Sequence, residues 1–138
     1  MTAPNEKFFQ DVEFGEELPE TRPDVSIDNV KLFARSARMM APRFIDHAAA
    51  REAGLPGAIV PGIMSQGILV ALIHGWASNA TILKVDTIFR APLIVDTEPV
   101  ASGVVTDIDD ESKVIEIDLM LKNERGETPV VGTARISL

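Results

Sequence analysis

Hydrophobic positions follow two different periods along the chain, and the change falls near Gly75. Before it, residues 27–40 carry apolar side chains at every third or fourth position, which predicts an amphipathic helix that ends ahead of Pro42. Residues 61–76 are apolar nearly all round, and this pattern predicts a helix that is buried on most sides. A shorter helix is expected over residues 46–53.

The ends of that shorter helix carry residues that suit helix termini. The Asp46 carboxylate can accept hydrogen bonds from the first free N–H groups, and Gly54 suits the position just after the last turn. The acidic opening segment, residues 1–20, is expected to be a partly ordered lead-in with one short strand.

After the buried helix, apolar and polar residues alternate, as they do in antiparallel strands with one face in water. The clearest stretches are residues 83–90, 115–122 and 130–138. Turns are expected at residues 107–112 and 123–126, which together give four long strands with no helix between them. The buried helix is the only large apolar element that can cover such a sheet. The order therefore predicts a single α+β domain over residues 1–138, with a curved antiparallel sheet wrapped around a central helix.

Composition and charge exclude several classes of function. The net charge of −8 provides no basic field for phosphate backbones, so no nucleic-acid partner is expected. The chain has no cysteine and only 2 histidines, which argues against disulfides and against the usual zinc sites. The acidic N-terminus does not resemble a signal peptide, and no stretch reaches the roughly 18 apolar residues of a membrane span. We therefore expect a cytoplasmic protein without a metal or cofactor.

Motifs that carry chemistry are scarce. The segment around Ser65 reads Gly-Ile-Met-Ser-Gln-Gly, which is not the nucleophile elbow of serine hydrolases, and there is no phosphate-binding or dinucleotide motif. One positive feature is Pro61-Gly62 at the start of the buried helix. A glycine there lets a ligand approach the free N–H groups of a helix N-terminus, which can polarise a carbonyl.

Several segments, spread over nearly the whole chain, resemble the MaoC-like hydratase/dehydratase family. They are residues 11–16, 59–64, 89–93 and 123–134. The family usually has His where Pro61 stands. The resemblance implies a hot-dog fold and a substrate that is an enoyl or 3-hydroxyacyl thioester of CoA or acyl carrier protein.

The family's hydration motif, F-A-x-x-S-G-D-x-N-P-x-H-x-D, aligns with residues 33–46 without a gap. Pro42 and Asp46 match the motif. The positions of its catalytic Asp, its Asn and its catalytic His are occupied by Met39, Ala41 and Phe44. His47 cannot replace the missing His by a simple shift, because the residue five positions before it is Pro42.

These replacements remove the acid–base chemistry but keep features of a binding site. Neither Met nor Phe transfers protons at pH 7, and general acid–base catalysis typically contributes about 10²–10⁴-fold. No catalytic residue is therefore expected on this chain, whereas the carbonyl-polarising Gly62 is retained. The expected substrate-binding residues are Met39, Phe44, Asp46, Pro61, Gly62, Ile63 and Met64.

Three functions remain open at this point. The first is a non-catalytic, acyl-tunnel-forming subunit of a heteromeric hydratase, in a heterodimer with a catalytic MaoC-like chain. The second is a homodimer that binds acyl-CoA or another hydrophobic ligand without catalysis. The third is a hot-dog thioesterase that uses a carboxylate such as Asp46. An uncovered sheet edge makes an oligomer expected in each case.

Overall fold

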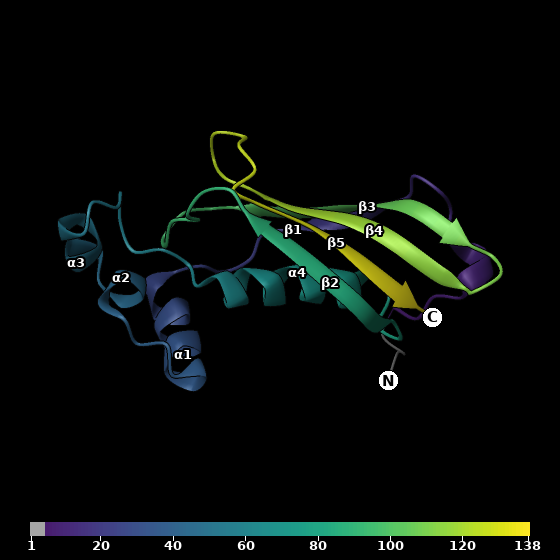
Figure 1. Cartoon of the computed structure of the whole chain (residues 1–138), viewed down its shortest axis with the longest axis horizontal. Coiled ribbons are helices and arrows are strands. Elements are labelled where there is room, and N and C mark those ends of the chain that lie inside the picture. The colour runs from purple at the N-terminus through teal and green to yellow at the C-terminus, as the bar shows by residue number, and fades with distance from the viewer. Residues whose placement is uncertain (1–4) are drawn as a thin grey trace.

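The computed structural model describes residues 5–138 and has one five-stranded antiparallel sheet in the order β1-β3-β4-β5-β2 (Figure 1). The strands are β1 (Glu17–Thr21), β2 (Thr81–Phe89), β3 (Val100–Asp109), β4 (Val114–Lys122) and β5 (Val130–Ser137). The helices are α1 (Ile27–Ala37), α2 (Pro42–Ile45), α3 (His47–Glu52) and α4 (Gly62–Trp76), and a 3-10 turn (Phe9–Asp11) precedes β1. No helix in this part of the chain is both long and apolar enough to cross a membrane.

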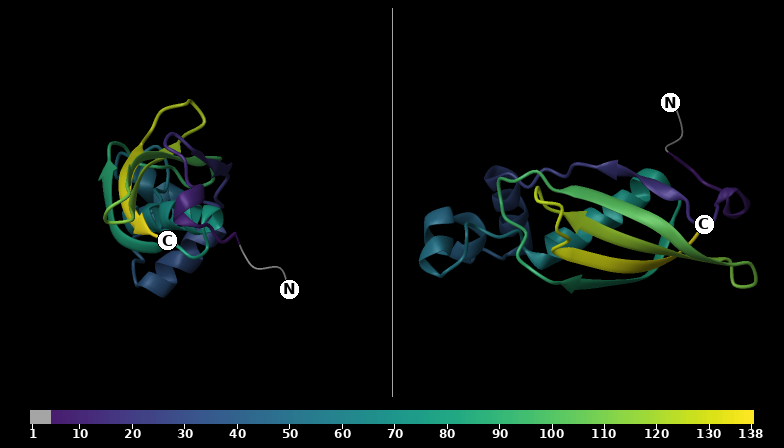
Figure 2. Two further views of the ribbon diagram at one scale, coloured as in Figure 1. Left: turned by 90° about the vertical axis from the view of Figure 1, so that its right-hand side faces the viewer. Right: turned by 90° about the horizontal axis from the view of Figure 1, so that it is seen from above.

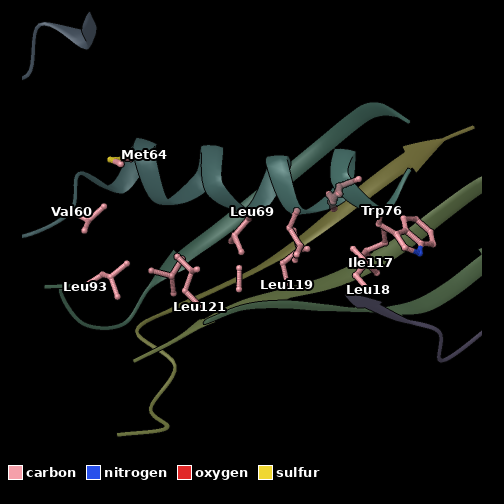
Figure 3. Close-up of a cluster of buried hydrophobic side chains, with 14 of the residues drawn as sticks. Leu18, Val60, Met64, Leu69, Trp76, Leu93, Ile117, Leu119 and Leu121 are labelled. Carbon is pink, nitrogen blue, oxygen red and sulfur yellow. The ribbon is translucent and has the colours of Figure 1, made fainter. Parts of the chain in front are cut away.

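The sheet curves around α4, and the space between them is filled by apolar side chains (Figure 2). Leu69 and Trp76 of α4 face Ile117 and Leu119 of β4 across this core (Figure 3). Leu18 of β1, which is 2% exposed, closes the core below Trp76. Burial of apolar surface is the main term that stabilises such a two-layer unit. The predicted α+β fold, a curved antiparallel sheet wrapped around a central helix, is confirmed.

A glycine in β5 allows two backbones and the helix to approach closely. A Cβ placed on Gly132 would lie 2.8 Å from the carbonyl oxygen of Asp86 in β2 and 3.7 Å from Leu69 Cδ1 of α4. Contacts of 2.8 Å between carbon and oxygen are too short for the ladder to keep its spacing. Gly132 is therefore required where β5 is sandwiched between β2 and α4.

The helices α1, α2 and α3 lie beyond the end of the sheet, next to the start of α4 (Figure 1). The prediction of one helix through Met40 was wrong, because α1 ends at Ala37. Arg38 has a left-handed backbone with φ of 58°, and the Met39 N–H turns back to bond the Ala34 carbonyl oxygen at 2.7 Å. The residues after this turn then form α2, which the helical repeat did not predict.

The other predicted elements match within a few residues. The strands expected at 83–90, 115–122 and 130–138 are β2, β4 and β5, and the short opening strand is β1. The part of that opening prediction that falls on residues 1–4 lies outside the described residues. The turn expected from Asp107 begins later, because β3 continues to Asp109. A bulge between Val105 and Asp107 shifts the pairing of β3 with β4 and lets the strand run on.

Candidate functional site

A groove of about 350 Å³ lies at the N-terminal end of α4, where the helix meets the segment after β2. Its walls include Val60, Leu93 and Val130, and its polar side chains are Ser65 and Arg90. The Val60 N–H donates to the Leu93 carbonyl oxygen at 2.8 Å, which fixes the start of α4 against the opposite wall. The groove is thus a mostly apolar channel built on rigid backbone pairing.

The first turn of α4 begins at this groove, which Gly62 lines. The Pro61 carbonyl oxygen accepts from Met64 at 3.0 Å and from Ser65 at 3.1 Å, so the N–H groups of Gly62 and Ile63 precede the first intrahelical bonds. Such a helix terminus carries a partial positive charge that favours a carbonyl oxygen or an anion. Gly62 lines the groove, and its neighbourhood can therefore polarise a ligand carbonyl.

Phe89 lies close to Gly62 at the start of α4. A Cβ on Gly62 would lie 3.1 Å from Phe89 Cζ, so the aromatic ring rests against the helix end. The ring is 52% exposed and forms part of the groove wall. The Gln66 side chain donates to Thr87 Oγ1 at 3.0 Å, which ties α4 to β2 close to this ring. The site is therefore made jointly by α4 and the end of β2.

A second hollow of about 500 Å³ adjoins the groove. The two share Arg90, Ala91 and Pro92, and the far wall of the second hollow is formed by the loop between β4 and β5. Within that loop Arg125 and Glu127 are paired, with Nε and Oε1 2.9 Å apart. Residues 90–92 therefore border both the apolar groove and the second hollow.

The structure separates the seven predicted binding residues. Gly62 lines the groove, while Met64 is buried beside the core and Ile63 is 60% exposed. Met39 is half-buried in the turn after α1, and Phe44 is buried in α2, with the Arg43 guanidinium 4.5 Å from its ring centre.

The hydration-motif segment still reaches the groove through its backbone. The Arg43 carbonyl oxygen accepts from the N–H of Ile59, a lining residue, at 2.9 Å. Pro61 is buried at the N-cap of α4 and does not line the groove itself. The segment that aligns with the family's hydration motif is therefore attached directly to the groove wall.

Asp46 serves the local fold. Its Oδ1 accepts from the N–H groups of Ala48 at 2.9 Å and Ala49 at 3.2 Å, which makes it the N-cap of α3 as predicted. The structure thus gives Asp46 a structural role that does not depend on proton transfer.

His47 is engaged at both ring nitrogens. Its Nδ1 accepts from the Ala58 N–H at 2.9 Å, so the hydrogen is on Nε2, which donates to Asp96 Oδ2 at 2.8 Å. The other oxygen of Asp96 accepts from the Ile27 N–H at 2.8 Å, at the start of α1. A histidine with both nitrogens bonded has no free lone pair for a substrate proton. The pair instead fastens α1 and α3 to the segment that leads into α4.

This fastening predicts a pH dependence. The hydrogen bond from His47, and then the one from the Ile27 N–H, hold the pKa of Asp96 below its ordinary value. The stabilisation is therefore fully present above the ordinary pKa of about 4 and is lost as pH falls through the lower folded-state value. Between about pH 5 and pH 2, the Tm of the native protein should fall more than that of Asp96→Asn.

A matched control for this measurement is Asp110→Asn, which alters an exposed carboxylate in the turn between β3 and β4. Its Tm should follow the native curve through the same titration. Parallel curves for the native protein and Asp96→Asn would contradict the assigned role of Asp96.

Sequence reasoning missed Phe89, Arg90 and Ser65 as groove residues. In the sequence, residues 89–93 resemble only a strand motif of the family, and the residues around Ser65 do not form a nucleophile motif. Their proximity depends on how the end of β2 crosses the first turn of α4, which no local pattern encodes. Within residues 5–138 there is no cluster of three or more His, Asp or Glu side chains that could hold a metal ion.

Solved structures of hydratases and dehydratases have a similar fold. An (R)-hydratase from A. caviae involved in PHA biosynthesis superposes with a TM-score of 0.88 at 21% identity, over 94% of this chain and 98% of that one. A chain of the ChsH1–ChsH2 complex from Mycobacterium tuberculosis gives 0.83 at 20% identity, over 91% and 98%. A MaoC-like dehydratase from Rhodospirillum rubrum gives 0.79 at 19% identity, over 94% of each chain. Neither the protein-family models nor the curated proteins yield a match. The chain thus has the hot-dog fold of MaoC-like hydratases and dehydratases.

Proposed function

We propose that the chain is a MaoC-like protein that binds an acyl thioester and serves as the non-catalytic subunit of a heteromeric hydratase or dehydratase. The observation that carries the proposal is the contrast between two neighbouring features. The groove at the α4 terminus keeps Gly62 and apolar walls, whereas the motif segment attached to it holds Met39 and Phe44 in place of acid–base residues.

These two features provide carbonyl polarisation but no proton transfer. A helix terminus can polarise a thioester carbonyl and so favour charge that develops on its oxygen. Hydration also needs a group that removes a proton from water and one that delivers a proton to carbon. Met39 and Phe44 supply neither, and His47 is fully hydrogen-bonded elsewhere. A second chain must therefore provide the proton transfers.

The exposed outer edge of β2 supports the proposal that a partner chain binds there. β2 is the last strand of the sheet, and Leu83, Ile88 and Phe89 on it are each more than half exposed. A long edge strand with exposed apolar side chains is a ready surface for pairing with another strand. The description of one structural neighbour as a ChsH1–ChsH2 complex shows that this fold occurs in assemblies of two different chains.

The test is co-expression with a hot-dog chain that carries Asp and His in the hydration motif, chosen from the neighbouring genes. We expect a stable complex of the two chains in size-exclusion chromatography with mass determination. Ile88→Lys should weaken it, because an exposed lysine on an edge strand disfavours strand pairing.

The control is Phe14→Lys, which changes another exposed large apolar residue (75% exposed, against 60% for Ile88) ahead of β1, at the opposite edge of the sheet from β2. It should leave the complex intact. A chain that remains unassociated with such partners and forms only copies of itself would favour the ligand-binding homodimer instead. Thiol release from acyl-CoA that Asp46→Asn abolishes would favour the thioesterase.

A further inference from the structure

Ser65 is an unusual residue for the inside of this protein. It is 1% exposed, and among residues 5–138 it is the one polar residue that is buried. It lies in the first turn of α4, three residues after Gly62, and both line the groove. Residues three apart lie on the same side of a helix, so Ser65 and the helix terminus at Gly62 border the same groove.

The hydroxyl of Ser65 has no hydrogen-bond partner among residues 5–138. Every side-chain nitrogen or oxygen atom that is fully enclosed in this part of the chain does have a partner. Its oxygen is therefore not fully enclosed, and the groove is the space that Ser65 lines. Ser36 in α1 shows the usual alternative, because its Oγ donates to the Leu32 carbonyl oxygen one turn earlier at 2.9 Å. A nearly buried hydroxyl without a partner is unfavourable unless a ligand satisfies it.

The surroundings specify the kind of ligand. Apart from Ser65 and Arg90, the groove is lined by apolar side chains and by Gly62, so an ionised group would be poorly solvated at the Ser65 position. A neutral carbonyl oxygen could accept from the hydroxyl while its alkyl chain contacts walls such as Val60 and Leu93.

We propose that the Ser65 hydroxyl donates a hydrogen bond to the thioester carbonyl oxygen of a bound acyl group, beside the N–H groups at the α4 terminus. This assignment rests on the proposed acyl-thioester function and adds a specific binding residue to it. It makes Ser65 a side chain that favours a carbonyl-bearing ligand over a purely alkyl one.

The experiment compares two probes that differ only in the carbonyl, butyryl-CoA and the thioether S-butyl-CoA. Binding is measured by calorimetry on the full chain in the assembly in which it purifies, with its partner chain where one co-purifies. The native protein should bind butyryl-CoA several-fold to about tenfold more tightly than S-butyl-CoA. Ser65→Ala should lose most of this preference and keep only the part that the backbone N–H groups of the α4 terminus supply.

Controls separate this role from a structural one. Ser65→Ala should keep its Tm, because no hydrogen bond within the protein is lost, and Ser65→Cys provides a second variant of similar size with a weak donor. Ser36→Ala should leave the carbonyl preference unchanged.

A Ser65→Ala or Ser65→Cys protein that retains the native preference for butyryl-CoA would overturn the assignment while leaving the proposed function standing. Failure of the native protein to bind either probe would instead contradict the proposed function, and the assignment of Ser65 with it.

Discussion

Replacing Met39 by Asp, Ala41 by Asn and Phe44 by His is expected to give the chain an enoyl-thioester hydration activity that the unaltered chain lacks. The backbone that would hold these groups is present, since α2 begins at Pro42 and Asp46 caps α3. Restored proton transfer should raise the rate by about 10²–10⁴-fold over the unaltered chain. The measurement is the loss of enoyl absorbance from crotonyl-CoA.

The matched control carries Asn at positions 39 and 41 and Gln at position 44, which are polar groups that do not transfer protons. It should remain inactive. Because Phe44 is buried, the Tm of both triple variants must be measured alongside. A folded Asp/Asn/His variant that binds butyryl-CoA but hydrates nothing would contradict the register in which Met39 and Phe44 replace the catalytic pair.

Gly132→Ala is expected to be among the most destabilising single substitutions in the sheet. Its added methyl group would lie 2.8 Å from the Asp86 carbonyl oxygen and 3.3 Å from Thr87 Cγ2, so the β2–β5 ladder would have to separate. Overpacking of this kind typically costs 1–3 kcal/mol of folding free energy. Urea unfolding followed by circular dichroism would measure it.

Gly67→Ala is the matched control, because a Cβ at that position in α4 would meet nothing within 4 Å. Removing a glycine from a helix interior should raise the free energy of unfolding by roughly 0.5–1 kcal/mol. Equal unfolding midpoints for the two variants would show that the close approach of β2, β5 and α4 is not as tight as described.

The layered fold could be predicted from the sequence because period and order constrain it strongly. The all-round apolar run from Gly62 to Trp76 could only be a central helix, and the strand alternation after it could only be covered by that helix. The end of α1 could not be predicted, since the left-handed Arg38 interrupts a repeat that continues in the sequence through Met40. Single-residue backbone choices of this kind depend on tertiary context.

The candidate site was predictable only in part. Gly62 at a helix start carries a local signal, whereas the role of His47 depends on Asp96, which is 49 residues away in sequence. Ser65 has no motif that marks it, and its significance comes from burial without a partner beside a groove. The expected absence of a catalytic pair rests on the register in which Met39 and Phe44 align with the family motif, and it stays a prediction.

The central claim is that this chain supplies a binding half-site and depends on another chain for proton transfer. The most direct measurement is the rate of crotonyl-CoA hydration by the purified native chain, alone and in complex with an Asp/His-bearing hot-dog partner. The claim predicts no hydration above the buffer rate for the chain alone and turnover for the complex. Hydration by the chain alone at the rate of the complex would contradict it.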